Sequence, residues 1–347
     1  MAGCGRGGWC LIVGLAALLA RAGLAAPRSA GDAPDDVPVA EAVGEAHDGP
    51  ADRRGFFDVA RESIFGPWDR APWTPIRLRG LLTEGWRDPW IEAPPGPSGA
   101  LRQGWIGAAD GNFYRLAYFS YNETFGVAQG GNGYAAQYDL YTPLSRRLLL
   151  LTKVPYLNAN SPSLNLPTTT FGTSGATTNR LAGRESSFGD LTLTPRVLLG
   201  ETRARSLSAE LSVQIPTGST RSGAGRAILS PGIHFWADLG GRWSTRGGFN
   251  VSQGVNKAGA GTTLISQLAI GRTVTPHDVP LLGDFTYYLA ANVSDQVGSK
   301  PSTGVTLGPG FRTHLGRDYY LLGAATIPVV APRPYDESMT LWFMKLF

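Results

Sequence analysis

Apolar and polar residues alternate with a period of two along much of the chain after residue 112. In one such stretch Leu207, Leu211 and Ile215 are separated by serine, glutamate and glutamine. Side chains of a β-strand point alternately to its two faces, so this pattern predicts strands with one apolar and one polar face. The clearest stretches are residues 190–196, 206–215, 243–252 and 305–314.

The number and length of these stretches favour a barrel. We predict about twelve strands, most of them about nine to thirteen residues long, which is close to the length that crosses a bilayer at a tilt. One apolar and one polar face suits a barrel with lipid outside and water inside, although a half-buried soluble sheet has the same pattern. The expected strand centres are Phe119, Tyr138, Leu151, Leu193, Leu211, Phe235, Phe249, Leu268, Leu289, Leu307, Gly323 and Phe343.

The connections between the strands alternate in length. Tight turns are expected at residues 142–146, 200–206, 240–242 and 316–318, and long Gly/Ser/Thr-rich loops at residues 160–187, 216–226 and 253–262. Short periplasmic turns and long external loops are typical of outer-membrane barrels. The predicted fold class is therefore all-β: a transmembrane antiparallel up-and-down β-barrel of about twelve strands, preceded by an N-terminal extension that is not part of the barrel.

The chain ends in an apolar, aromatic strand instead of a polar tail. Met339, Leu341, Phe343 and Phe347 occupy alternate positions, and Lys345 interrupts the series. This ending resembles that of outer-membrane β-barrel proteins, which commonly terminate in phenylalanine. We expect the strand to close the barrel and to be the part that the barrel-assembly machinery binds; a buried last strand of a soluble β-domain is the alternative.

Three prolines fall inside predicted strands. Pro195, Pro231 and Pro309 each follow a short apolar/polar run. Proline cannot donate a hydrogen bond to a β-ladder and is expected at bulges or edges. We therefore predict three bulges that bend the barrel wall.

Before the strands, the sequence divides into three parts. Residues 1–25 have the layout of a signal peptide, with a charged start, a short apolar run and small residues before the expected cleavage. Residues 26–54 predict a disordered tail. Residues 55–110 hold five of the nine tryptophans among many prolines, and residues 56–66 predict a short amphipathic helix. This arm is interpreted as a plug or a partner-docking segment, or else as a segment packed on the periplasmic rim of the barrel at residues 111–347.

Composition argues against several classes of function. Both cysteines, Cys4 and Cys10, lie in the expected signal peptide, so the mature chain offers no thiol. The net charge is +4 without a run of lysine or arginine, so no nucleic-acid partner is expected. We find no phosphate-binding, dinucleotide-binding, zinc or serine-hydrolase motif, and no two of the four histidines have metal-ligand spacing. We expect no catalytic residue, no metal site and no cofactor.

Two sets of side chains are candidates for functional roles. Charges on the polar faces either tune what passes through a wet lumen or brace the wall as cross-strand pairs, and their mixed signs argue against strong ion selectivity. Aromatic rings near the short turns predict a girdle at the membrane interface. The lumen candidates are Asp139, Asp190, Arg196, Glu210, Asp238, Arg246 and Arg312. The candidates for girdle and closure are Tyr141, Trp236, Trp243, Tyr287, Tyr319, Tyr320 and Phe347.

A run of motifs at residues 188–221 resembles a known family. It contains G-D-L-T-L-T-P-R, a short turn, and an alternating strand that ends in P-T-G. This order is similar to that of the family described as "Putative MetA-pathway of phenol degradation", and the resemblance covers roughly residues 113–347. It implies an outer-membrane barrel similar to channels for hydrophobic compounds and fatty acids, but no particular binding residue.

Together these observations predict a channel in the outer membrane of a Gram-negative-type bacterium, in contact with outer-membrane lipid. It would pass small molecules in or out without an energy source, and the resemblance suggests hydrophobic or aromatic ones. The solute itself is not predicted. The alternative is a structural or surface-interaction barrel with a closed lumen, and a hydrolase embedded in a barrel is the third reading.

Overall fold

The computed structural model of the protein describes residues 55–67, 72–126, 132–159, 164–169, 176–181, 187–218, 225–255, 261–297, 302–331 and 333–347. The expected signal peptide and disordered tail lie outside these residues. No helix in the described part of the chain is long and apolar enough to cross a membrane.

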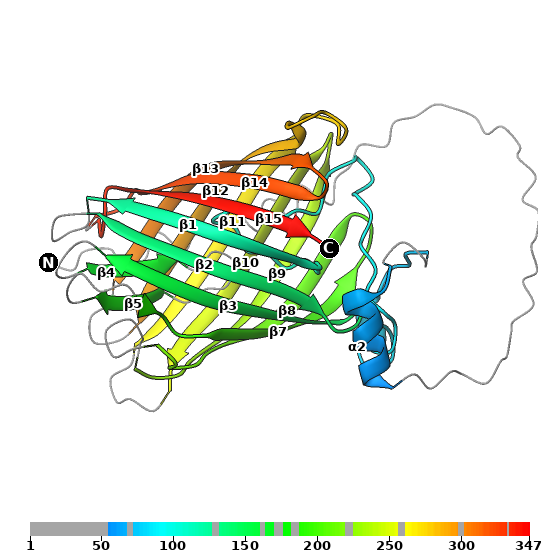
Figure 1. The fold of residues 1–347 in the computed structure, drawn as a ribbon, viewed down its shortest axis with the longest axis horizontal. Coiled ribbons are helices and arrows are strands. Elements are labelled where there is room, and N and C mark those ends of the chain that lie inside the picture. Colours follow the sequence, from blue (N-terminus) through cyan, green and yellow to red (C-terminus); the bar gives the residue numbers. More distant parts are fainter. Residues whose placement is uncertain are drawn as a thin grey trace, which may run out of the picture. The chain divides into compact units, whose positions relative to one another are not determined.

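Twelve antiparallel strands form a closed barrel (Figure 1). Each of them pairs with its neighbour in the chain, and the last strand, β15, pairs with the first, β1, from Leu116↔Leu346 to Phe125↔Glu337. The predicted fold class is confirmed, and each expected strand centre falls within one of these strands. The wall consists of β1 (Leu116–Phe125), β2 (Gly133–Pro143), β3 (Leu148–Ala159), β7 (Thr192–Glu201), β8 (Arg205–Gln214), β9 (Ile228–Gly240), β10 (Trp243–Gly254), β11 (Thr262–Thr273), β12 (Gly283–Val297), β13 (Ser302–Gly316), β14 (Tyr319–Pro328) and β15 (Glu337–Leu346).

A few short elements lie outside the wall. The strands β4 (Leu164–Thr169) and β5 (Ala176–Leu181) pair with each other inside the predicted long loop, and β6 (Ser187–Phe188) pairs with β3. The arm contains the helix α2 (Phe56–Phe65) and the 3-10 turn η1 (Leu78–Gly80). The predicted helix at residues 56–66 is thus present.

The alternating sequence pattern becomes an apolar outer face and a polar inner face. Phe119, Ile233 and Phe343 are 51%, 54% and 50% exposed on the outside. Arg196 and Asp139 are completely buried on the inside. An outer surface of this kind matches hydrocarbon, and the polar groups turn toward the lumen.

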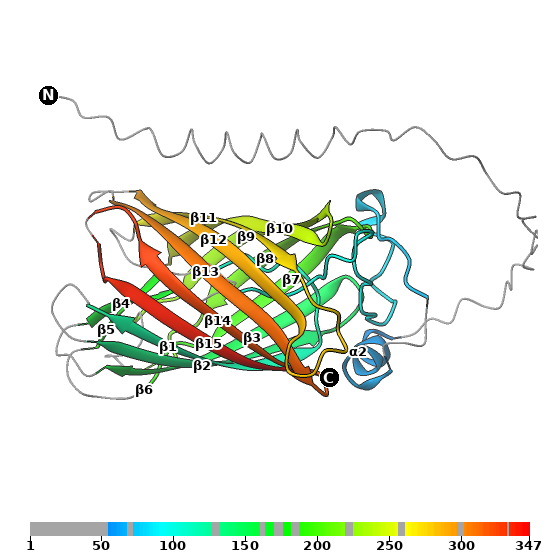
Figure 2. The ribbon, with the colours of Figure 1, turned by 90° about the horizontal axis from the view of Figure 1, so that it is seen from above.

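The two ends of the barrel differ, as Figures 1 and 2 show. One end carries the turns at residues 241–242 and 317–318, the helix α2 and the C-terminus. The other end carries β4 and β5 and the longer connections. We call the first end the short-turn end.

The three prolines do not form bulges. Pro195 keeps its register with Leu150, Pro231 with Leu211 and Pro309 with Leu289. On its other side, the pairing with the following strand is interrupted and then resumes in the same register. A missing N–H removes ladder hydrogen bonds on one side only, so the expected extra residue is not needed and the bulge prediction is wrong.

Lys345, which interrupts the apolar ending, reaches the water-exposed turn between β13 and β14. Its ammonium donates to the carbonyl of Arg317 at 2.6 Å, lies 3.4 Å from the carboxylate of Asp318, and sits over the ring of Tyr319. A long stem can cross an apolar surface while its charge stays in a polar zone. The lysine therefore fits an outward-facing position at the barrel end.

Candidate functional site

In the structure the arm continues to Tyr114, just before β1, and its last part, residues 103–114, lies inside the barrel at its short-turn end. The backbone N–H of Ile106 donates to the Tyr288 hydroxyl of β12 at 2.9 Å, and the rings of Trp105 and Tyr288 stack 5.0 Å apart. A Cβ atom added to Gly271 of β11 would lie 2.8 Å from the Trp105 ring. The wall is therefore glycine where the arm's tryptophan packs against it, and the arm fills this part of the lumen with a close-packed core.

Two rim contacts hold the arm where it enters the barrel. The N–H and hydroxyl of Ser98 donate to the carboxylate of Asp238 on β9, at 2.9 and 2.6 Å. Arg102 forms an ion pair with Glu201 at the end of β7, and the Trp73 indole N–H donates to the same carboxylate at 3.1 Å. Burial lowers the pKa of the Arg102 guanidinium, and the neighbouring Glu201 opposes that shift. The rim contacts are thus polar and charged.

Deeper in the lumen, Asp110 is the charged residue within residues 103–114. Its carboxylate lies 3.6 Å from the Arg246 guanidinium of β10 and accepts a hydrogen bond from the Tyr141 hydroxyl at 3.5 Å. The Arg246 guanidinium also lies over the Trp105 ring, 4.6 Å from its centre. Arg246 is therefore covered on one side by the arm and paired with it on another.

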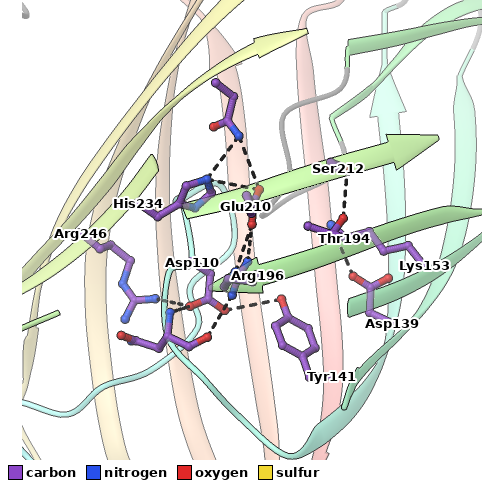
Figure 3. A network of polar contacts seen from close by, with 12 residues as sticks. Asp110, Asp139, Tyr141, Lys153, Thr194, Arg196, Glu210, Ser212, His234 and Arg246 are labelled. Atoms are coloured by element: carbon purple, nitrogen blue, oxygen red, sulfur yellow. Dashed lines mark hydrogen bonds and ion pairs between the residues drawn. The ribbon is translucent and has the colours of Figure 1, made fainter. Parts of the chain in front are cut away.

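A second network joins the arm to β7, β8, β9 and β10 (Figure 3). Arg196 donates to Glu210 at 3.0 and 2.8 Å and to the backbone carbonyl of Asn112 at 2.9 Å. The other oxygen of Glu210 lies 3.2 Å from the His234 ring nitrogen, which is 3.3 Å from Asn250. All of these side chains are buried. Because buried charges are costly unless paired, this chain of partners keeps charged groups in the filled part of the barrel.

A third polar group lies on β2 and β3. Lys153 and Asp139 are register partners, are completely buried, and are 3.6 Å apart. The Tyr118 hydroxyl of β1 donates to the same aspartate, and its ring stacks on Trp342 of β15 at 4.3 Å. This group braces the wall across the closing seam.

The structure places most lumen candidates inside, in different settings. Asp139, Arg196, Glu210 and Arg246 belong to the three groups above. Asp190 accepts from Gln214 and from the N–H of Gly218 at the long-loop end. Asp238 is at the rim and binds the arm. Arg312 is buried on β13 but stands apart from these networks. Their proposed effect on what passes through the lumen stays a prediction.

The girdle prediction is wrong for three aromatic residues. Tyr141, Trp236 and Tyr320 are buried inside the barrel, where Tyr141 faces Asp110, Arg102 lies over Trp236, and Arg312 lies over Tyr320. Residues two apart in a strand share a face. Tyr141 follows Asp139 by two and Trp236 precedes Asp238 by two, so proximity to a turn gave the right level in the barrel but the wrong face.

The other aromatic candidates lie on the outer side. The rings of Trp243 and Tyr287 meet edge to face at 6.1 Å, and Tyr319 stacks on Phe343 at 5.5 Å. The backbone N–H of Phe347 donates to the carbonyl of Arg115, just before β1, at 3.0 Å. A girdle role for these rings stays a prediction.

Several site residues have no counterpart among the sequence candidates. Lys153 could have been found as the cross-strand partner of Asp139, but its strand reads L-L-L-L-T-K and does not alternate. Asp110 and Asn112 lie in a segment without periodicity, and Glu201 sits in a predicted turn. Their partners are distant in the sequence, so only the closed barrel identifies them.

The described residues contain no cluster of histidine, cysteine, aspartate or glutamate that could hold a metal ion. His277 contacts Asp284 at 2.6 Å and stacks on His314, whose ring lies 3.3 Å from the His277 carbonyl. His234, His277 and His314 are the histidines in the described part of the chain. None of them forms a hydrogen bond with a serine.

A closed twelve-stranded antiparallel wall, an apolar exterior and a polar interior define an outer-membrane β-barrel. Residues 112–321 match the sequence model of the family described as "Putative MetA-pathway of phenol degradation", so the chain belongs to that family. No curated protein sequence matches the chain.

Solved outer-membrane structures have similar folds. An outer membrane channel from Pseudomonas putida F1 is 14% identical, with a TM-score of 0.51 over 74% of this chain and 100% of that chain. The KdgM porin in complex with disordered oligogalacturonate is 9% identical with a TM-score of 0.41, and the NanC porin is 6% identical with a TM-score of 0.45. Each of these two matches covers 67% of this chain and 99% of the porin.

Proposed function

We propose that the protein is a non-enzymatic outer-membrane channel for small molecules whose own N-terminal arm closes the short-turn end of the lumen. The observation that carries the proposal is the polar attachment of residues 103–114 to the inner wall. Asp110 pairs with Arg246, and Asn112 accepts a hydrogen bond from Arg196 through its backbone and another from Ser206 at 2.9 Å through its side chain. Apolar contacts would stabilise a permanently closed lumen at least as well, since a buried ion pair contributes little net stability. The polar contacts therefore favour an arm that can leave the lumen.

The setting is the proposed outer membrane. Lipid covers the apolar outer face, the short-turn end faces the periplasm, and the leader at residues 1–25 directs export. The barrel-assembly machinery recognises the last strand, β15. Passage is passive, and the family to which the chain belongs favours a small solute with an apolar or aromatic body.

A reversible lock tests the closing role of the arm in the full mature chain. A Cβ at Gly248 of β10 would lie 2.8 Å from the Cβ of Ala109. A disulfide needs a Cβ separation of about 3.5–4.5 Å, so the variant Ala109→Cys/Gly248→Cys needs a small shift of the arm. Cys4 and Cys10 lie in the expected leader, so the engineered pair would be the mature chain's only cysteines.

The measurement is conductance of the purified barrel in a planar bilayer. The oxidised double variant should stay closed, and a reducing agent should restore the behaviour of the parent protein. Each single-cysteine variant is the matched control and should not respond to the redox change. A chain that lacks residues 27–110 should conduct more than the parent. If neither the parent nor the shortened chain conducts or passes small solutes, the barrel is structural and the channel proposal is wrong.

A further inference from the structure

A cavity of about 340 Å³ lies between the arm and the short-turn ends of the strands β12 to β15. Trp90 and Gln103 come from the arm, and Arg312 and Tyr320 come from the barrel wall. A volume of this size is at the lower end of the range for small-molecule pockets, which are about 300–1,000 Å³. The cavity borders the contacts that hold the arm through Arg102 and Tyr114, but it includes neither Asp110 nor Arg246 nor the Arg196–Glu210 pair.

Arg312 is the unusual member of this lining. Of the five buried arginines in the described part of the chain, four have carboxylate or carbonyl partners: Arg146, Arg147, Arg196 and Arg246. Arg312 forms no ion pair or hydrogen bond with any described residue. Its guanidinium lies over the ring of Tyr320, 4.0 Å from the ring centre, and interacts with the carboxylates of Asp284 and Glu92 without contacting them. A buried guanidinium without an anion is costly, so this position calls for one.

A second unpartnered group lines the same cavity. Gln103 is only 2% exposed, and neither its amide oxygen nor its amide nitrogen has a hydrogen-bond partner. Buried amides are normally bonded at both ends. An amide N–H and a guanidinium around one cavity together provide donors for a carboxylate.

The acidic residues of the lining limit the charge of an occupant. Asp284 contacts a ring nitrogen of His277 at 2.6 Å, and Asp318 lies 3.4 Å from the Lys345 ammonium, so each of these carboxylates already has a partner. Glu92 lies at the exposed edge of the cavity. Arg102 also lines the cavity but pairs with Glu201, so Arg312 is the guanidinium of the lining without an ion-pair partner. One such guanidinium together with Glu92 suits an occupant with a single negative charge and disfavours a dianion.

Much of the remaining lining is aromatic or apolar. The rings of Trp90, Tyr114 and Tyr320 and the side chains of Leu116 and Met344 line the same space. Aromatic walls favour flat, apolar bodies over flexible polar chains. We propose that this cavity binds a small aromatic monocarboxylate, with the carboxylate on Arg312 and Gln103 and the ring between the arm and β14.

The test compares three probes of similar size on the purified full-length mature barrel by isothermal titration calorimetry: benzoate, benzyl alcohol and benzylamine. Benzoate should bind to one site, and benzyl alcohol should bind about tenfold more weakly or worse, because hydrogen bonds to charged groups are the stronger ones. Benzylamine should not bind. Equal binding of benzoate and benzyl alcohol would overturn the carboxylate site, and tighter binding of benzylamine would assign the pocket to Glu92 instead.

Variants identify the residues on the protein side. Arg312→Gln should weaken benzoate about tenfold or more without changing benzyl alcohol, Arg312→Lys should weaken it less, and Gln103→Leu should also reduce it. Arg272→Gln is the matched control, because Arg272 is exposed and lies over Trp243 on the outside. Heat-modifiable gel migration checks that each barrel is folded. Unchanged benzoate binding in Arg312→Gln would refute the site. Binding is measured without a solute gradient, so its failure and the failure of the channel are separate results.

Discussion

The carboxylate of Asp110 and the guanidinium of Arg246 are 3.6 Å apart, and they join the arm to the opposite wall of the barrel. Asp110 belongs to the arm, and Arg246 belongs to β10. In the described part of the chain, Arg246 has no other ion pair and no hydrogen bond. Replacing Asp110 would therefore leave the buried Arg246 guanidinium without an ion-pair partner.

The variant Asp110→Asn should open the channel more often. It keeps the shape of the side chain and removes the charge that pairs with Arg246. Removing one partner of a buried ion pair typically costs about 3–5 kcal/mol, and about 1.4 kcal/mol is a factor of ten, so we expect the open fraction in bilayer recordings to rise about tenfold or more. Asp190→Asn is the control, since Asp190 binds Gln214 of β8 and Gly218 of the connection that follows, and not the arm. Equal opening in both variants would contradict a specific role for Asp110.

Removing one member of the Arg196–Glu210 pair should destabilise the barrel strongly. Arg196→Met leaves Glu210 buried, and breaking such a pair typically costs about 3–5 kcal/mol. We expect the lower part of this range because His234 remains 3.2 Å from the carboxylate. The double variant Arg196→Met/Glu210→Leu should cost less than the sum of the single variants. Denaturant unfolding in lipid vesicles measures this, and strict additivity would show that the two residues act independently.

Arg115 should control the stability of the helix α2. Its guanidinium donates to the carbonyls of Gly66, Ile64 and Ser63 at 2.6, 3.2 and 3.4 Å. These carbonyls belong to the end of the helix, which lacks partners of its own. Arg115→Ala should therefore speed hydrogen exchange in residues 56–65 by about tenfold or more, given about 1.5–3 kcal/mol for such bonds.

The matched control for Arg115 is Arg61→Ala, because Arg61 is an exposed residue on the same helix. This change should leave exchange unchanged or slow it slightly, since alanine has the higher helix propensity. Similar acceleration in the two variants would show that surface charge, and not the Arg115 contact, sets the stability of α2.

An arginine in the middle of the outer face should be costly. Leu289 lies near the centre of β12 and is 48% exposed, whereas Val297 is the last residue of the same strand and is 49% exposed. Charge on the lipid face costs about 2–4 kcal/mol at the midplane and about 0–1 near the interface. Leu289→Arg should therefore reduce the free energy of unfolding in vesicles far more than Val297→Arg. Equal losses would argue that this face does not meet hydrocarbon.

The strands could be predicted because their signal is local. Leu207, Leu211 and their neighbours alternate with polar residues whatever the rest of the chain does, so face and period follow from the sequence. The same rule would have corrected the girdle, because Tyr141 shares the face of Asp139. Lys345 shows that a charged residue can occupy an apolar face of a strand. Its aliphatic stem lies along that face, and its ammonium reaches the adjoining turn.

The position of the arm could not be predicted in this way. Ser98 binds Asp238, and Trp105 stacks on Tyr288, so the partners are more than a hundred residues apart. No periodicity marks Gln103 or Asp110, and their surroundings exist only once distant strands are side by side. The prolines led to a wrong prediction because a local rule was applied without knowledge of the neighbouring strands. At Pro195 the pairing between β7 and β8 is interrupted and then resumes in the same register, so no bulge forms.

The way the arm is attached determines the order in which the molecule can be completed. Its contacts with Tyr141, Glu201, Asp238 and Tyr288 come from strands around the whole circumference. The arm precedes the strands in the chain, yet these contacts require β2, β7, β9 and β12 to be in place. Beside the seam, Arg115 also donates to the carbonyl of the last residue, Phe347, at 2.7 Å. The arm can therefore dock completely only after these strands have formed, and a barrel that lacks them leaves its lumen open.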